Sequence, residues 1–181
     1  MVGARVLSVN VSSDHRFSKA PVERADVVAG VGIRGDCHAG AQVQHRSRVA
    51  ADPSQPNLRQ VHLIGAELFD RVAAHGHTVR PGDLGENLTT ADIDLHALPT
   101  GTVLLVGETV LLGLTGLRNP CGQINQWSAG LQQQLTGHDG NGRPVLLGGV
   151  MAVVLHGGTV RPGAPIEVSE PPGQGTPLVR V

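Results

Sequence analysis

Apolar residues along the chain follow mainly the patterns of short β-strands. Residues 4–11 alternate apolar and polar positions, and we expect further strands at residues 21–29 and 59–64. Toward the C-terminal end, apolar runs rich in β-branched residues cover residues 149–155 and 166–168. The pattern therefore predicts many short strands, distributed over the whole chain.

One pair of strands is predicted to form a hairpin. The apolar segments 103–106 and 109–114 flank Gly107 and Glu108. A two-residue loop that begins with glycine suits a type II′ turn, which connects neighbouring antiparallel strands.

Helical patterns are few. Apolar residues repeat every four positions between residues 64 and 72, and Gly76 is a natural C-terminal stop. A short helix is also expected at residues 131–135. The polar segment 42–57 and the glycine-containing segment 81–90 are interpreted as loops.

Many short strands and few helices indicate a mainly β protein. Helices do not alternate with strands as a parallel α/β sheet requires, so we predict a closed or partly closed antiparallel β-barrel with a few peripheral helices. A length of 181 residues fits one domain. We assign residues 1–170 to it and expect the segment 171–181, rich in proline and glycine, to be a loose tail.

Composition excludes several classes of partner. A formal net charge of −1 offers no electrostatic basis for binding nucleic acid or an anionic membrane. No apolar stretch approaches the roughly 20 residues that span a bilayer, and the N-terminus lacks a signal-peptide core. We therefore expect a cytoplasmic protein. Lys19 is the sole lysine among 14 basic residues; arginine suits phosphate and carboxylate ligands, although genomic base composition explains the same bias.

A glycine-rich segment matches a dinucleotide-binding pattern only superficially. Residues 30–35 read G-x-G-x-x-G, but the residues that follow, 36–40, contain another glycine and no helical apolar period. Pyrophosphate binding requires a helix that begins within the motif. We interpret residues 30–35 as a turn.

Histidines and a cysteine in the first third of the chain raise the possibility of a metal site. His38, His45 and His62, together with Cys37 and Asp36, offer zinc-ligating atoms. Their spacing matches no common zinc pattern, since neither C-x-x-C nor H-E-x-x-H occurs. We favour a polar pocket lining in which imidazoles donate to a bound anion or transfer protons.

The segment 115–122 carries the strongest candidate for chemistry. Asn119 is a favourable N-cap and Pro120 a favourable first helical residue, which would place Cys121 in the first turn of a helix. There the exposed backbone N–H groups, together with Arg118, favour thiolate over thiol. A small buried cysteine that packs as a hydrophobe is the alternative, and the residues alone leave both open. Cys37 has a mixed charge environment and is interpreted as an incidental thiol.

The order of motifs along the chain resembles that of small MOSC proteins, a family named after the C-terminal domain of molybdenum cofactor sulfurase. Together the motifs span from about residue 5 to about residue 168. They lie at residues 35–40, 44–48, 59–64, 81–90, 92–95, 115–121, 149–154 and 158–163.

This resemblance implies a β-barrel with a few peripheral helices and a pocket for the molybdenum cofactor (molybdopterin). Cys121 corresponds to the family cysteine, which ligates molybdenum or carries sulfur. Arg118, Asn87, His38 and His62 fall in motifs that surround the cofactor pocket in relatives. The cofactor carries a phosphate, which arginine or backbone donors bind, and thiolate is a suitable molybdenum ligand.

Three functions are compatible with the resemblance. The first is an oxidoreductase that reduces N-hydroxylated compounds, with Cys121 as the molybdenum ligand. The second is a sulfur carrier with a persulfide on Cys121, and the third is a non-catalytic cofactor-binding module. The chain lacks the desulfurase and iron–sulfur domains of some relatives, so a sulfur or electron donor is expected to be a separate protein.

Overall fold

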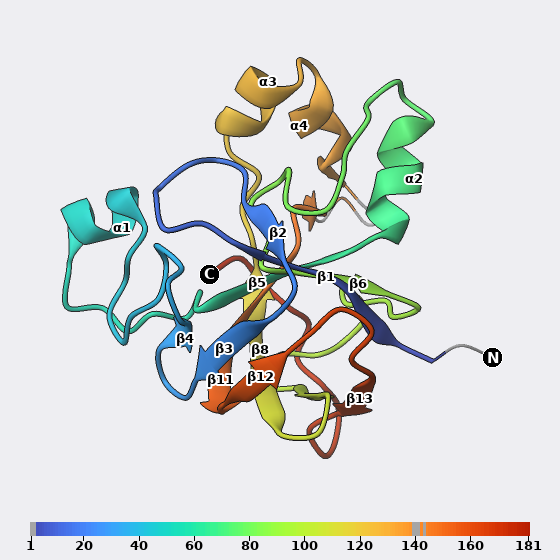
Figure 1. Cartoon of the computed structure of the whole chain (residues 1–181). Coiled ribbons are helices and arrows are strands. Elements are labelled where there is room, and N and C mark those ends of the chain that lie inside the picture. The colour runs from blue at the N-terminus through green and yellow to red at the C-terminus, as the bar shows by residue number, and fades with distance from the viewer. Residues whose placement is uncertain (1–2, 139–141, 143) are drawn as a thin grey trace.

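The computed structural model of the protein describes residues 3–138, 142 and 144–181 (Figure 1). Its main feature is an eight-stranded sheet in which most neighbours are antiparallel. In spatial order the strands are β13 (Ile166–Ser169), β7 (Val103–Val106), β8 (Val110–Leu117), β11 (Val150–His156), β5 (Val61–Gly65), β6 (Leu88–Ala91), β1 (Arg5–Val11) and β2 (Ala20–Val22).

Two smaller sheets and four short helices complete the described part of the chain. The smaller sheets are β12 (Gly158–Val160), β3 (Ala25–Val28) and β4 (Gly32–Ile33), and β10 (Pro144–Leu146) with β9 (Thr136–His138). The helices are α1 (Arg46–Ala51), α2 (Glu67–Ala73), α3 (Gln123–Trp127) and α4 (Leu131–Gln134). In Figure 1, α1 lies to one side of the strands, and α3 and α4 lie together at another. No helix among these residues has the length and apolar character needed to cross a membrane.

The hydrophobic core forms two clusters. The larger one packs between strands and contains buried residues such as Val6, Leu63 and Leu112. The smaller one joins α2, α3 and α4 to the sheet through residues that include Ile64 and Ile124. Because full burial of such a side chain stabilises a fold by about 1.5–3 kcal/mol, the second cluster fixes the short helices, which are too short to be stable alone.

The mainly β prediction is confirmed, but the closed barrel is not. The large sheet runs from β13 to β2 without a strand ladder that closes it. Its margins approach each other where the Val6 N–H donates to Ala164 O at 2.9 Å and the Ile166 N–H to Ala4 O at 2.8 Å. The strands are also not uniformly antiparallel, because β5 and β6 pair in parallel.

Several elements differ from the sequence prediction. The expected strand at 21–29 divides into β2 and β3, and the expected loops 42–57 and 81–90 contain α1 and the start of β6. All four residues of β6 are buried, so no alternation of apolar and polar positions marks it. The β7–β8 loop has three residues, because Val106 pairs with Val110.

The glycine run at residues 30–35 forms a turn that includes the short strand β4, and no helix begins within it. Gly32 has a φ of +119°, and a Cβ there would lie 2.8 Å from Gln60 O. Glycine at this position is therefore explained by a close approach of two backbones.

The C-terminal segment, which the sequence predicts to be a loose tail, makes contacts with the rest of the chain near its end. Pro177 bridges Pro99, Arg180 bridges Leu117 at the end of β8, and Leu178 is buried. These contacts bring Arg180 to the pocket described below.

Candidate functional site

A pocket of about 680 Å³ lies where α1, the β1–β2 connection and the segment before α3 meet. The five residues that the sequence indicated all belong to its lining: Cys121, Arg118, Asn87, His38 and His62. The remaining lining residues are His15, Arg16, Phe17, His45, Arg48, Arg59, Gly85, Asn119, Gln123, Met151 and Arg180. Segments that are far apart in the sequence therefore contribute to one cavity.

The pocket lining is strongly basic, although the net charge of the chain is −1. Arginine residues and histidines line it, and none of its described lining residues is Asp or Glu. Arg16 pairs with Asp14 at 3.2 Å on the surface. In the described part of the chain, no side-chain carboxylate forms an ion pair with Arg48, Arg59 or Arg118. Arg59 Nη2 donates to the oxygen of Val181, the last residue. Such a lining favours an anionic ligand.

Cys121 lies just before α3 and not in its first turn, so the predicted helix start is wrong. The helix begins at Gln123, and Gly122 is its N-cap with φ −59° and ψ −19°. The Cys121 thiol is half-buried and donates to Gln123 Oε1 at 3.6 Å. The Cys121 carbonyl accepts from the Ile124 N–H at 3.0 Å, and Gln132 Nε2 of α4 donates to Pro120 O at 3.1 Å. The loop that carries the thiol is therefore held by both short helices.

The Arg118 guanidinium is fixed beside this loop. Its Nη1 donates to Leu84 O at 2.8 Å, and its Cζ lies 5.8 Å from the centre of the Phe17 ring. Burial lowers the pKa of Arg118 below its ordinary value, while the nearby Cys121 and Glu86 act in the opposite direction. Arginine nevertheless stays charged near neutral pH. Arg118 thus presents a positioned cation close to the thiol.

His62 and Asn87 are buried residues of the pocket lining that hydrogen-bond to each other. The Asn87 N–H donates to His62 O at 2.8 Å, and the His62 N–H donates to Asn87 Oδ1 at 3.1 Å. Asn87 Nδ2 donates to Asp36 Oδ2 at 3.0 Å, and His62 Nε2 donates to Gly148 O at 2.8 Å. Burial lowers the pKa of His62 well below its ordinary value. His62 is therefore a neutral donor, and the Asn87 amide holds protein groups in place.

A buried ion pair lies next to His38, and the residues predicted for the site do not include it. Lys19 Nζ is 2.6 Å from Asp36 Oδ2, and both side chains are only 1% exposed. The His38 N–H donates to Asp36 Oδ1 at 3.0 Å. Burial alone would raise the pKa of Asp36, but hydrogen bonds from His38 and the charge of Lys19 lower it strongly. The sequence offered two signals for this pair: Asp36 lies two residues before His38, and Lys19 is the sole lysine.

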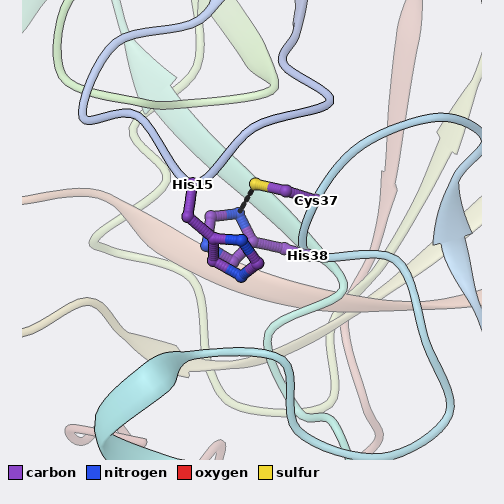
Figure 2. A group of neighbouring side chains, drawn as sticks. All are labelled: His15, Cys37 and His38. Atoms are coloured by element: carbon purple, nitrogen blue, oxygen red, sulfur yellow. Dashed lines mark hydrogen bonds between the residues drawn. The ribbon is translucent and has the colours of Figure 1, made fainter.

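His15, Cys37 and His38 form a separate cluster, of which His15 and His38 line the pocket (Figure 2). One potential ligand atom from each lies within 4.8 Å of the other two, which sequence spacing did not indicate. His38 Nδ1 is 3.4 Å from Cys37 Sγ and also 3.4 Å from Lys19 Nζ. Burial raises the pKa of Cys37, and Asp36 raises it further. The ammonium group of Lys19 and the basic lining oppose a bound cation here.

Two buried polar atoms of the pocket lack a hydrogen-bond partner among the described residues: His45 Nδ1 and Arg59 Nε. Burial lowers the pKa of His45 to about 3, and its ring stacks on His38 with centroids 4.3 Å apart. Burial also lowers the pKa of Arg59 to about 10. Unpartnered buried donors are uncommon in native proteins, and a ligand is one means of satisfying them.

Arg48 and Arg59 belong to motifs that the sequence analysis had noted, but neither was selected as a site residue. No sequence signal indicated Arg180, because its place in the pocket depends on the docking of the C-terminal segment.

Comparison with known proteins supports this architecture. The chain resembles the YuaD protein from Bacillus subtilis, with 22% identity, a TM-score of 0.75 and coverage of 93% of this chain and 96% of that one. It also resembles YiiM from Geobacillus stearothermophilus (18% identity, TM-score 0.65, coverage 96% and 79%) and YiiM from Escherichia coli (19%, 0.64, 96% and 73%). At these identities the likeness concerns the fold.

The family follows from the sequence itself. No curated protein matches the chain, but the profile of the MOSC domain matches residues 35–167, which is more than half of its length. That range contains Cys121 and most of the basic pocket lining. The chain therefore belongs to the MOSC family.

Proposed function

We propose that the protein binds the molybdenum cofactor in this pocket, with Cys121 as the metal ligand, and reduces N-hydroxylated compounds. The observation that carries the proposal is the convergence of a thiol with arginines such as Arg118 and Arg48, which pair with no described side-chain carboxylate, in a cavity whose described lining has no Asp or Glu. Such a cavity favours a ligand that is both anionic and able to bind sulfur.

The residues present fit this cofactor. Its phosphate requires guanidinium or N–H donors, and the buried Nε of Arg59 has no described protein partner. Its metal prefers a soft ligand, and the Cys121 thiol belongs to the pocket lining. A volume of about 680 Å³ lies within the usual range of ligand pockets.

When bound, the cofactor would supply the two-electron chemistry, with electrons from a separate redox protein. The protein's own residues hold the ligand and orient it. Arg118 is fixed by Leu84 O and by Phe17, so its charge is already positioned for an anion. The His38 N–H donates to Asp36 Oδ1, and the His38 side chain belongs to the pocket lining. This places an imidazole where protons can be exchanged with a substrate. His62 remains a neutral donor.

A sulfur carrier is the second candidate, and one observation favours it. The Cys121 thiol is half-buried rather than enclosed, and its described hydrogen-bond partner is Gln123 at 3.6 Å. An accessible sulfur is sufficient for a carrier, which would hold a persulfide on Cys121 and pass it to an acceptor.

Reductase assays separate the two functions. The protein is purified from cells that make the pterin cofactor and from cells that do not, and each preparation is supplied with an artificial electron donor. We expect N-hydroxylamine reduction only in the first preparation, its loss in Cys121→Ala and its retention in Cys37→Ala, the matched control. Equal inactivity of both preparations, together with a persulfide on Cys121 in mass spectra, would instead establish the carrier.

A further inference from the structure

The His38 ring is held in one orientation within the pocket lining. It stacks on the His45 ring with centroids 4.3 Å apart, and the His15 ring meets it edge-on with centroids 5.5 Å apart. The His38 N–H donates to Asp36 Oδ1 at 3.0 Å, and its carbonyl accepts from Asn57 Nδ2 at 2.9 Å. Contacts on both the backbone and the ring therefore fix which edge of the imidazole faces the protein.

The ring nitrogen Nδ1 of His38 faces buried groups. Lys19 Nζ and Cys37 Sγ each lie 3.4 Å from it, and Figure 2 shows the contact with Cys37. Asp36 Oδ1 lies at the same distance. Among the described residues none forms a hydrogen bond with the other ring nitrogen, Nε2. The His38 side chain is 21% exposed and lines the pocket, so Nε2 is the nitrogen available to a ligand.

The groups around Nδ1 determine where the His38 ring carries its proton. An ammonium group has three N–H donors and no acceptor, so Lys19 can hydrogen-bond to Nδ1 only where that nitrogen keeps its lone pair. Burial raises the pKa of the Cys37 thiol, which makes Cys37 a second, weaker donor. The acceptor among the described neighbours, Asp36 Oδ1, already accepts the His38 N–H. Two donors against one occupied acceptor favour a ring proton on Nε2.

A second proton on the ring is opposed by charge. It would place a positive imidazolium 3.4 Å from the Lys19 ammonium, whose own carboxylate partner, Asp36, lies 2.6 Å from it. Like charges at such a distance repel most strongly where water is excluded, and the Lys19 side chain is only 1% exposed. The ring next to Lys19 is therefore expected to stay neutral.

We propose that Lys19 is a positioning residue that fixes His38 as the Nε2–H tautomer, a neutral hydrogen-bond donor to the oxygen of a bound N-hydroxyl group. This inference rests on the proposed function and narrows the part of His38 in it. Because Lys19 occupies Nδ1, His38 donates through Nε2 and does not act as a base. A fixed donor at the oxygen stabilises the charge that develops there as the N–O bond breaks. That cleavage takes two electrons from the separate redox protein and two protons from solvent, and it yields the amine and water.

Nitrogen-15 NMR of histidine-labelled protein reads the tautomer directly, without cofactor or turnover. Spectra are recorded near neutral pH, and the His38 signals are assigned by their absence in His38→Gln. We expect Nε2 to appear as the protonated nitrogen and Nδ1 as the unprotonated one. A proton on Nδ1, or protons on both nitrogens, would overturn the inference.

Variants then test whether Lys19 sets the tautomer. Lys19→Met removes the ammonium from Nδ1, so the ring proton should move to Nδ1, where the Asp36 carboxylate remains as an acceptor. Cys37→Ala removes the other donor and should keep the proton on Nε2. Arg34→Gln removes an exposed cation 3.9 Å from Asp26 and should also change nothing. An Nε2–H tautomer retained in Lys19→Met, or lost in Cys37→Ala, assigns no role to Lys19. If Lys19→Met does not fold, the wild type and Cys37→Ala decide by the same criterion.

The donor role is tested with the cofactor-loaded protein and an N-hydroxylamine substrate. Glutamine offers an N–H donor where imidazole has Nε2, whereas leucine offers none. We expect His38→Leu to lower kcat about 100-fold and His38→Gln to remain within about tenfold of the wild type. An active wild type with both variants equally impaired overturns the donor role and leaves the reductase intact. If the wild type reduces nothing, the reductase and the donor role fail together, and NMR alone decides whether Lys19 fixes the tautomer.

Discussion

Removal of one partner of the Lys19–Asp36 ion pair tests whether this buried pair holds the pocket wall. In Lys19→Met the Asp36 carboxylate keeps hydrogen bonds from the His38 N–H at 3.0 Å and Asn87 Nδ2 at 3.0 Å, but loses its cation at 2.6 Å. Both partners are 1% exposed, so the loss leaves an uncompensated buried charge. Such losses cost about 3–5 kcal/mol, which is a large part of the 5–15 kcal/mol typical of a domain.

The assay is urea unfolding at pH 7, followed by the fluorescence of Trp127, the single tryptophan. The double variant Lys19→Met/Asp36→Asn removes both charges and keeps the side-chain shapes close to the originals. We expect it to be less destabilised than the sum of the single variants, with a coupling energy of about 2 kcal/mol or more. Arg34→Gln, which breaks the exposed pair with Asp26, is the control and should change stability by less than about 1 kcal/mol.

A coupling energy below about 0.5 kcal/mol would refute the role of the ion pair, because the effects of mutations at independent sites add to within about that value. This role would also be refuted if Lys19→Met were no more destabilising than Arg34→Gln.

Three further predictions follow from the site. Gly149→Ala should lower the free energy of unfolding by about 1–3 kcal/mol in urea titrations, because φ is +105° and the new Cβ would lie 2.5 Å from Leu63 O; a neutral result would contradict the packing. Burial lowers the pKa of His45 to about 3. As the pH falls, His45 is therefore protonated in the unfolded chain before it is protonated in the folded protein. The contribution of His45 to the free energy of unfolding is present above pH 6.5 and is lost as the pH falls toward 3. In that range the free energy of unfolding should fall by up to about 1.4 kcal/mol per pH unit, and His45→Gln should reduce this slope. Alkylation at pH 7 should modify Cys121 before Cys37, because burial raises the pKa of Cys37; peptide mapping that finds Cys37 modified first would refute this.

Sequence patterns located the strands whose apolar residues alternate or form apolar runs. β1, the β7–β8 hairpin and β11 all lie where their patterns predicted them, because each combines buried and exposed positions or a clear turn. β6 escaped prediction because it is buried along its whole length and contains threonine. The prediction of a barrel is not confirmed, because closure depends on long-range pairing between the N-terminal and C-terminal strands, and here that contact is an isolated bridge between Arg5 and Pro165.

The candidate site was predictable only where chemistry and motif coincided. Cys121, Arg118 and His38 stood out as reactive or charged residues in motifs, and the structure places all three in one pocket lining. The role of Asn87 was not visible, because its amide is occupied by His62 and Asp36, contacts that only the fold creates. The basic character of the pocket was equally hidden, since a net charge of −1 says nothing about where the charges gather.

The most direct test of the account is the molybdenum content of the purified protein. Protein from cells that make the pterin cofactor is analysed by elemental mass spectrometry, with Cys121→Ala as the test variant and Cys37→Ala as its matched control. We expect close to one molybdenum per chain in the wild type and in Cys37→Ala, and a large loss in Cys121→Ala. Wild-type protein free of molybdenum, or full molybdenum content in Cys121→Ala, would contradict it.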